Sequence, residues 1–155
     1  NKGKADRILV SLGPGSFTGV RIGIATARAL AYAWDAEILG YPTLSLIAAM
    51  AREQTGPQDV LTCMTGGHGE WFVQTFAGDG MPDGAHSSLP PAKAAHNRTS
   101  LVAGSQAEAL VELRGDGTAL KILPDARFVL TIPEILLSET TSPIYGRTPD
   151  AKLPV

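Results

Sequence analysis

The sequence predicts an α/β fold, and three features of the chain carry that prediction. An aliphatic run at 7–12 is followed by a helical stretch at 17–34 and a short apolar run at 35–41. Strand, helix and strand at this spacing form a βαβ unit with a parallel strand pair and a right-handed crossover. Further along, apolar runs at 60–64 and 70–76 flank a glycine turn at 65–69, which is typical of an antiparallel hairpin.

The composition narrows the class of protein. The chain has 155 residues, enough for one domain or two small lobes, and 44% of them are hydrophobic. Its formal charge of −2 argues against broad, unaided nucleic-acid binding, which needs clustered cations. Cys63 is the single cysteine, which excludes a disulfide framework and favours a reducing compartment. Because we find no signal peptide and no apolar stretch near 20 residues, we expect a cytoplasmic protein with no membrane contact.

A glycine turn ends the first strand. Gly13, Pro14 and Gly15 break the strand, and Ser16 or Thr18 can cap the helix that follows. A helix N-terminus after such a turn can contact an anion, so we predict an anion contact at Gly13, Gly15, Ser16 and Thr18. The turn has no lysine of the Walker A type, and no dinucleotide-binding fingerprint can be placed on its glycines. Pro14 and Thr18 stand where a nucleophile elbow around Ser16 would need glycines.

The helix at 17–34 has a ridge with almost no side chains. Gly19, Gly23, Ala27 and Ala31 recur at every fourth residue. A glycine inside a helix costs about 1 kcal/mol relative to alanine, and close approach of another backbone is the usual compensation. An apolar row and two arginines flank this ridge. We therefore predict a partner-binding face made of Phe17, Gly19, Val20, Arg21, Gly23, Ile24, Ala27 and Arg28.

The remaining elements are expected in the following order. Thr43 caps an amphipathic helix over 43–54, and 54–57 is the clearest boundary between lobes. Residues 77–99 form a long loop or a set of short pieces, and 101–104 is a short strand. Ser105 and Glu108 form a capping box that opens a helix to Arg114. A strand at 120–123, a helical turn at 133–137 and an extended tail from 142 complete the chain.

The sequence offers no catalytic or metal site. The three histidines, His68, His86 and His96, all lie in predicted turns or loops, and no His-x-x-x-His pair occurs. A triad of Ser16, His68 and an aspartate has no support from spacing. We therefore predict no catalytic residue, no metal and no cofactor.

One family resemblance covers several blocks of the chain. Gly-Pro-Gly-Ser-Phe-Thr-Gly-Val-Arg-Ile-Gly at 13–23 closely resembles the signature of the TsaB (YeaZ) proteins. These proteins are relatives of the TsaD/Kae1 enzymes, once called glycoproteases and grouped with the M22 peptidases. The resemblance continues at 27–31 and 40–44, and it returns in Pro-Ile-Tyr-Gly-Arg at 143–147. The first block is long and specific, whereas the middle of the chain matches only in pattern.

The resemblance implies an actin-like ATPase (ribonuclease H-like) fold of two lobes. Residues 1–56 would be the remainder of the first lobe, and residues 57–155 the second lobe. The family carries a strand, a hairpin and a helix before this point, so we expect the first lobe to be incomplete at its N-terminus. Family members usually have a charged turn where this chain has Thr65-Gly66-Gly67, so no role tied to that charge is expected here.

The resemblance also implies a function. The chain would be a non-catalytic subunit that binds a TsaD-type enzyme, which threonylcarbamoylates the tRNA adenosine beside the anticodon. A TsaE-type ATPase would be a further partner, tRNA would be contacted only through the complex, and homodimers would form when TsaD is absent. Two alternatives stay open, namely an M22-type peptidase or hydrolase and a nucleotide-binding module that uses the turn at 13–16.

Overall fold

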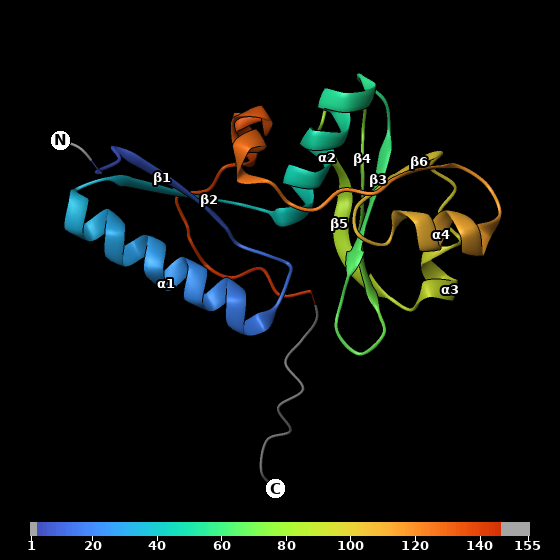
Figure 1. The fold of residues 1–155 in the computed structure, drawn as a ribbon, viewed down its shortest axis with the longest axis horizontal. Helices are drawn as coiled ribbons and strands as arrows, with labels where there is room; N and C mark the ends of the chain where they lie inside the picture. Colours follow the sequence, from blue (N-terminus) through green and yellow to red (C-terminus); the bar gives the residue numbers. More distant parts are fainter. Residues whose placement is uncertain (1–2, 147–155) are drawn as a thin grey trace, which may run out of the picture.

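A two-stranded parallel sheet carries the first part of the chain, as the computed structural model of residues 3–146 shows (Figure 1). It pairs β1 (Arg7–Ser11) with β2 (Glu37–Tyr41), and α1 (Phe17–Trp34) connects the two strands. The predicted βαβ unit is therefore confirmed. Within the described residues β1 pairs with no strand except β2, so its other edge is free.

A five-stranded mixed sheet carries the second part, in the strand order β5-β4-β3-β6-β7. The predicted antiparallel hairpin is confirmed as β3 and β4, and β3 also pairs in parallel with β6. The strands are β3 (Val60–Thr65), β4 (Trp71–Phe76), β5 (Pro82–Leu89), β6 (Leu101–Ala103) and β7 (Thr118–Leu120).

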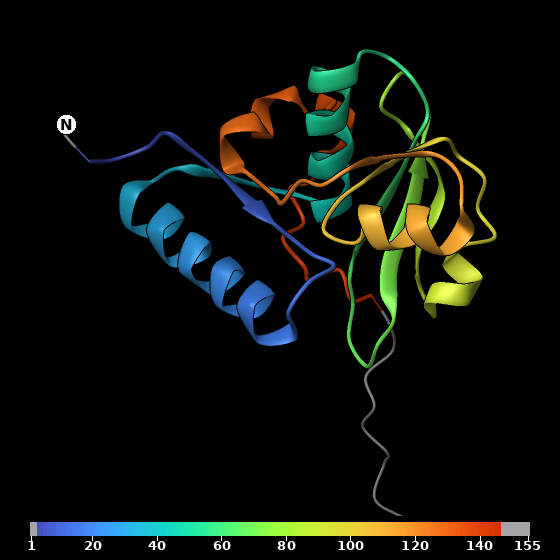
Figure 2. The ribbon, with the colours of Figure 1, turned by 45° about the vertical axis from the view of Figure 1, so that its right-hand side comes forward.

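Helices cover both faces of this sheet (Figure 2). On one face, α2 (Thr43–Thr55) packs Leu44, Ile47 and Ala51 against buried strand residues such as Phe76. On the other face lie α3 (Pro91–Ala94) and α4 (Ala107–Arg114). The second side of α2 packs against β2 and two 3₁₀ helices, η1 (Ala126–Thr131) and η2 (Glu134–Leu136). Thus α2 contributes to the packing of both sheets.

Several local predictions were wrong, each for a physical reason. The stretch 77–99 is a set of short pieces, one of the two forms expected, but its eight-residue edge strand β5 was not predicted, because its proline, glycine and serines concealed it. Ser105 does not open a capping box, because its hydroxyl accepts from the Thr65 amide and α4 begins only at Ala107. Thr43 does not cap α2, because its hydroxyl lies 2.7 Å from that of Ser11.

One further boundary moved, one element was not predicted, and one prediction was met. β7 ends where the strand at 120–123 was expected to begin, and η1 was not foreseen. The helical turn expected at 133–137 is present as η2. The predicted tail continues past residue 146, and Arg147 and the residues after it lie outside the described part of the chain.

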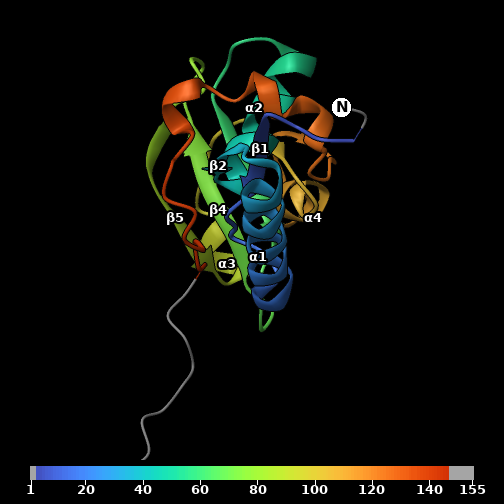
Figure 3. The same ribbon diagram turned by 90° about the vertical axis from the view of Figure 1, so that its left-hand side faces the viewer.

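Residues 138–146, here called the C-terminal strap, run back along the first sheet and α1 (Figure 3). Ser138 exchanges two backbone hydrogen bonds with Gly40 on β2. The Ile144 amide donates to the Leu12 carbonyl at 2.6 Å. The Tyr145 carbonyl lies 3.2 Å from Nε2 of His86 on β5. The strap follows both sheets in the sequence and contacts both of them.

Candidate functional site

The helix α1 has one buried face and one open face. Ile24, Ala27 and Ala31 are buried, and among the named helices and strands α1 packs mainly against β1 and β2. The opposite face is exposed to solvent and is unusually apolar. Ile22 is 61% exposed and Tyr32 is 93% exposed, with small exposed residues between them. Large exposed side chains of this kind, gathered on one helix face, mark a candidate interaction surface.

The small-residue ridge predicted from the sequence is exposed at its N-terminal end and buried at its C-terminal end. Ile24 and Ala27, both predicted to bind a partner, lie in the interior of the chain with 3% and 6% exposure. Gly19 and Gly23 are exposed, and a Cβ added at Gly23 would meet no atom within 4 Å. The part of the ridge that can receive another protein is therefore its N-terminal half.

The other predicted partner-binding residues lie at the border between α1 and the C-terminal strap. The Phe17 ring stacks on that of Tyr145, with 5.3 Å between ring centres. The Arg21 guanidinium lies over the same Phe17 ring, at 4.8 Å from its centre. Arg28 donates from Nε and Nη2 to the hydroxyl and carbonyl oxygens of Thr141, at 2.9 and 2.8 Å. The N–H donors of Arg28 are thus used within the chain, whereas within residues 3–146 Arg21 has only its contact with the Phe17 ring.

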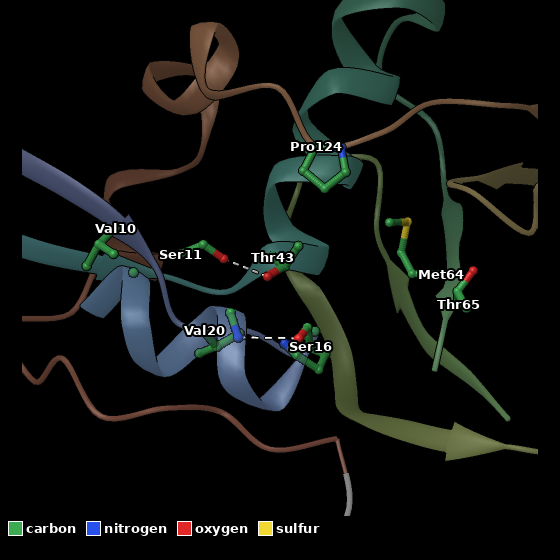
Figure 4. Close-up of a pocket in the computed structure, with 12 residues that line it drawn as sticks. Val10, Ser11, Ser16, Val20, Thr43, Met64, Thr65 and Pro124 are labelled. Carbon is green, nitrogen blue, oxygen red and sulfur yellow. Dashed lines mark hydrogen bonds between the residues drawn. The ribbon is translucent and has the colours of Figure 1, made fainter. Parts of the chain in front are cut away.

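A pocket of about 370 Å³ lies between the N-terminal end of α1 and the second sheet (Figure 4). Its lining side chains are mostly aliphatic, with hydroxyls from Ser11, Ser16, Thr43 and Thr65. The described lining includes no charged residue, histidine or cysteine. The complete set is Val10, Ser11, Pro14, Gly15, Ser16, Gly19, Val20, Gly23, Thr43, Met64, Thr65 and Pro124.

Two of the four predicted anion contacts reach this pocket. Gly15 and Ser16 line it, and the Ser16 hydroxyl caps α1 by accepting from the Gly19 amide at 3.3 Å, as predicted. Thr18 is exposed on the first turn of α1. Gly13 is buried, its carbonyl accepts from the Thr43 amide, and an added Cβ would lie 2.5 Å from the Ile144 carbonyl oxygen. The anion contact stays a prediction.

Four residues at or directly behind the candidate surface were not assigned to it from the sequence. Ile22 and Tyr32 belong to the exposed face of α1, and a helical projection that put Ile24 inside would have put them outside. Thr141 and Tyr145 come from the strap, more than a hundred residues from the helix they contact. No local pattern could have joined these two segments.

Two kinds of chemical group in residues 3–146 bear on catalysis, namely metal ligands and the cysteine thiol. No group of three or more histidines, cysteines or carboxylates is placed to hold a metal ion in this range. Burial raises the pKa of the Cys63 thiol to about 12. At neutral pH the thiol is therefore protonated, and the reactive thiolate form is almost absent. None of the described helices is both long and apolar enough to span a bilayer.

Comparison with known protein families gives one match that covers more than half of the chain. Residues 1–85 match the family described as TsaD, tRNA N6-adenosine threonylcarbamoyltransferase. Two curated proteins named tRNA threonylcarbamoyladenosine biosynthesis protein TsaB also match. The Bacillus subtilis (strain 168) protein is 44% identical over 50 residues, which are 32% of this chain and 22% of that protein. The Escherichia coli (strain K12) protein is 39% identical over 67 residues, which are 43% of this chain and 29% of that protein. The matches thus span less than a third of each curated relative.

Solved structures match over most of the chain. YeaZ from Pseudomonas aeruginosa superposes with a TM-score of 0.73 at 25% identity, over 90% of this chain and 73% of its own. A crystal structure described as an uncharacterised protein similar to peptidase YeaZ from the same organism has a TM-score of 0.74 at 24% identity. It covers 92% of this chain and 74% of its own. The fold is the actin-like, ribonuclease H-like fold expected from the sequence.

Proposed function

Because the chain belongs to the family matched by the TsaD model, and within it to the TsaB (YeaZ) proteins, we propose that it is a non-catalytic subunit of tRNA threonylcarbamoyladenosine synthesis. Its task is to bind a TsaD-type enzyme through the exposed face of α1. The TsaD-type enzyme transfers the threonylcarbamoyl group, and tRNA is reached only through the complex.

One observation carries this proposal, namely the apolar outer face of α1. Ile22 and Tyr32 are largely exposed, and next to Ile22 in the sequence Gly23 has open space where a Cβ would lie. Exposed apolar surface is unfavourable in water. Its burial by a partner stabilises the complex by about 25 cal/mol for each Å² of apolar surface covered. A helix from another protein can approach closely where α1 has glycine and alanine instead of larger side chains.

The test is a pull-down and an affinity measurement with a TsaD-type protein. Ile22→Glu places a charge in the centre of the proposed interface, so binding is expected to weaken at least about a hundredfold. Gly23→Leu fills the open space beside it and is expected to have a similar effect. Ile22 is exposed, and a Cβ at Gly23 would meet no atom within 4 Å. The circular dichroism spectrum should therefore stay unchanged in both variants.

Leu130→Glu is the matched control. Leu130 is 83% exposed on η1, away from α1, so the same type of change should leave binding intact. If Ile22→Glu binds as well as Leu130→Glu does, α1 is not the interface and the proposal fails.

Further parts of the proposal concern assembly and location. In the absence of the TsaD-type protein, the same face of α1 joins two copies in a homodimer. A TsaE-type ATPase joins the complex, and the whole assembly works in the cytoplasm. Size-exclusion chromatography with light scattering, on the chain alone and after addition of each partner, measures these assemblies.

A further inference from the structure

We infer that Arg21 is a charged anchor that takes a carboxylate of the TsaD-type protein, and that Tyr145 of the C-terminal strap positions it. This inference rests on the proposed function and adds the chemistry of one contact to it. It assigns a role to a residue at the far end of the chain from α1.

Three side chains form a stack at the N-terminal end of α1. The Arg21 guanidinium lies 4.8 Å from the centre of the Phe17 ring, and that ring lies 5.3 Å from the Tyr145 ring with 27° between their planes. The stack lies at the surface, because Phe17 is 53% and Tyr145 is 38% exposed. A guanidinium held over a ring uses none of its five N–H donors in that contact, so they stay open to a ligand.

Arg21 differs from the other arginines of the first sheet and α1 in having its donors unused. Among residues 3–146 it makes no hydrogen bond and no ion pair, although it is held against a ring. Arg28 donates twice to Thr141, and Arg7 pairs with Glu37. The arginine beside the exposed apolar face of α1 is therefore the one that remains available.

A carboxylate fits this anchor better than a polyphosphate or an RNA backbone does. Nucleic-acid binding neutralises several phosphates with several cations, and the stack presents a single guanidinium on a chain of net charge −2. One carboxylate matches the planar fork of one arginine through two parallel hydrogen bonds. A charged group at the edge of an apolar face is also the usual arrangement of a protein interface.

Tyr145 acts through Phe17. The strap that carries Tyr145 is fixed on both sides of it, by the Ile144 amide on Leu12 and by the Tyr145 carbonyl at His86. Its ring covers the Phe17 ring, which limits the positions that Phe17 and the stacked Arg21 can adopt. An anchor held in advance loses less side-chain entropy on binding, so its contribution to affinity depends on Tyr145.

The experiment is a titration of the TsaD-type protein into the chain at two salt concentrations. Arg21→Gln is expected to weaken binding about fivefold at low salt and to reduce the salt dependence of the affinity. Tyr145→Ala should weaken binding by a similar factor, and Tyr145→Phe should bind as the unchanged chain does. The double variant R21Q/Y145A should bind no more weakly than Arg21→Gln, because the tyrosine acts only through the arginine.

Arg98→Gln is the matched control, since Arg98 is an exposed arginine of the second part of the chain and its substitution removes the same charge. If Arg21→Gln binds like Arg98→Gln, the anchor is overturned while the proposed function stands. If the double variant is weaker by the product of both factors, the positioning role of Tyr145 is overturned. If Arg21→Gln weakens only self-association, the carboxylate belongs to a second copy and the stated partner is wrong. Failure of the unchanged chain to bind would instead overturn the proposed function and the anchor with it.

Discussion

Cys63 is a buried thiol on β3, and burial determines its chemistry. It has no solvent exposure, and its pKa is raised to about 12. A thiol titrates to the reactive thiolate only as the pH approaches its pKa, so at pH 8 almost none of it is ionised. We expect the folded chain to resist a chromogenic disulfide reagent at pH 8 and to react with one equivalent after unfolding in guanidinium. Labelling of the folded chain at the rate of a free thiol would contradict this.

Gly13 is a glycine at the junction of α1 and the strap that a larger residue cannot replace without strain. Its φ is +98°, and an added Cβ would lie 2.5 Å from the Ile144 carbonyl oxygen. The left-handed conformation alone costs a non-glycine residue about 1–2 kcal/mol. Gly13→Ala should therefore lower the free energy of unfolding by at least about 2 kcal/mol in urea titrations.

Gly67→Ala is the control for that measurement. Gly67 lies in the β3–β4 turn, and an added Cβ there meets nothing within 4 Å. The free energy of unfolding of the Gly67→Ala variant should differ from that of the unchanged chain by less than about 0.5 kcal/mol. Equal losses for both variants would show that contact with the strap does not constrain Gly13.

At the scale of elements, α1 keeps a glycine where alanine would be more stable. Gly23 lies in the interior of the helix, with open space around the position of a Cβ. Gly23→Ala should raise the free energy of unfolding by about 0.5–1 kcal/mol, since alanine loses less backbone entropy in a helix. Thermal unfolding followed by circular dichroism measures the gain. A loss of stability would mean that the helix is already packed at this position.

How far the sequence predicts an element depends on how local the forces are that form it. The βαβ unit and the β3–β4 hairpin follow from apolar runs and turn residues, and both are present. The edge strand β5 carries Pro82 and Gly84 and pairs on one side only, so its pattern is that of a loop. Ser105 has a favourable capping position, but a strand neighbour, Thr65, takes its hydroxyl. The outer face of α1 was within reach of sequence reasoning, whereas the Phe17–Tyr145 contact was not.

At the scale of the whole molecule, the contact between Arg28 and Thr141 secures the strap on α1. Thr141 is 7% exposed, and its hydroxyl and carbonyl oxygens both accept from Arg28. Arg28→Ala leaves these buried oxygens without their donor. We expect the free energy of unfolding to fall by about 1–2 kcal/mol and amide hydrogen exchange to rise along α1.

Arg127→Ala serves as the comparison for Arg28→Ala. Arg127 is an arginine with an 85% exposed side chain that pairs with Asp125. Such surface pairs contribute about 0–1 kcal/mol, so exchange along α1 should not change. If both variants leave exchange along α1 at the level of the unchanged chain, the strap does not hold the helix.

The strap has a consequence for how the protein is made. Arg28 and Thr141 are separated by 113 positions in the sequence. At a synthesis rate of about 5–20 residues per second, Thr141 is therefore added about 6–23 s after Arg28. During that interval the nascent chain carries α1 beside a two-stranded sheet without the segment that joins it to the rest. The contact that holds α1 to the strap can therefore form only after residue 141 has been synthesised and has left the ribosome.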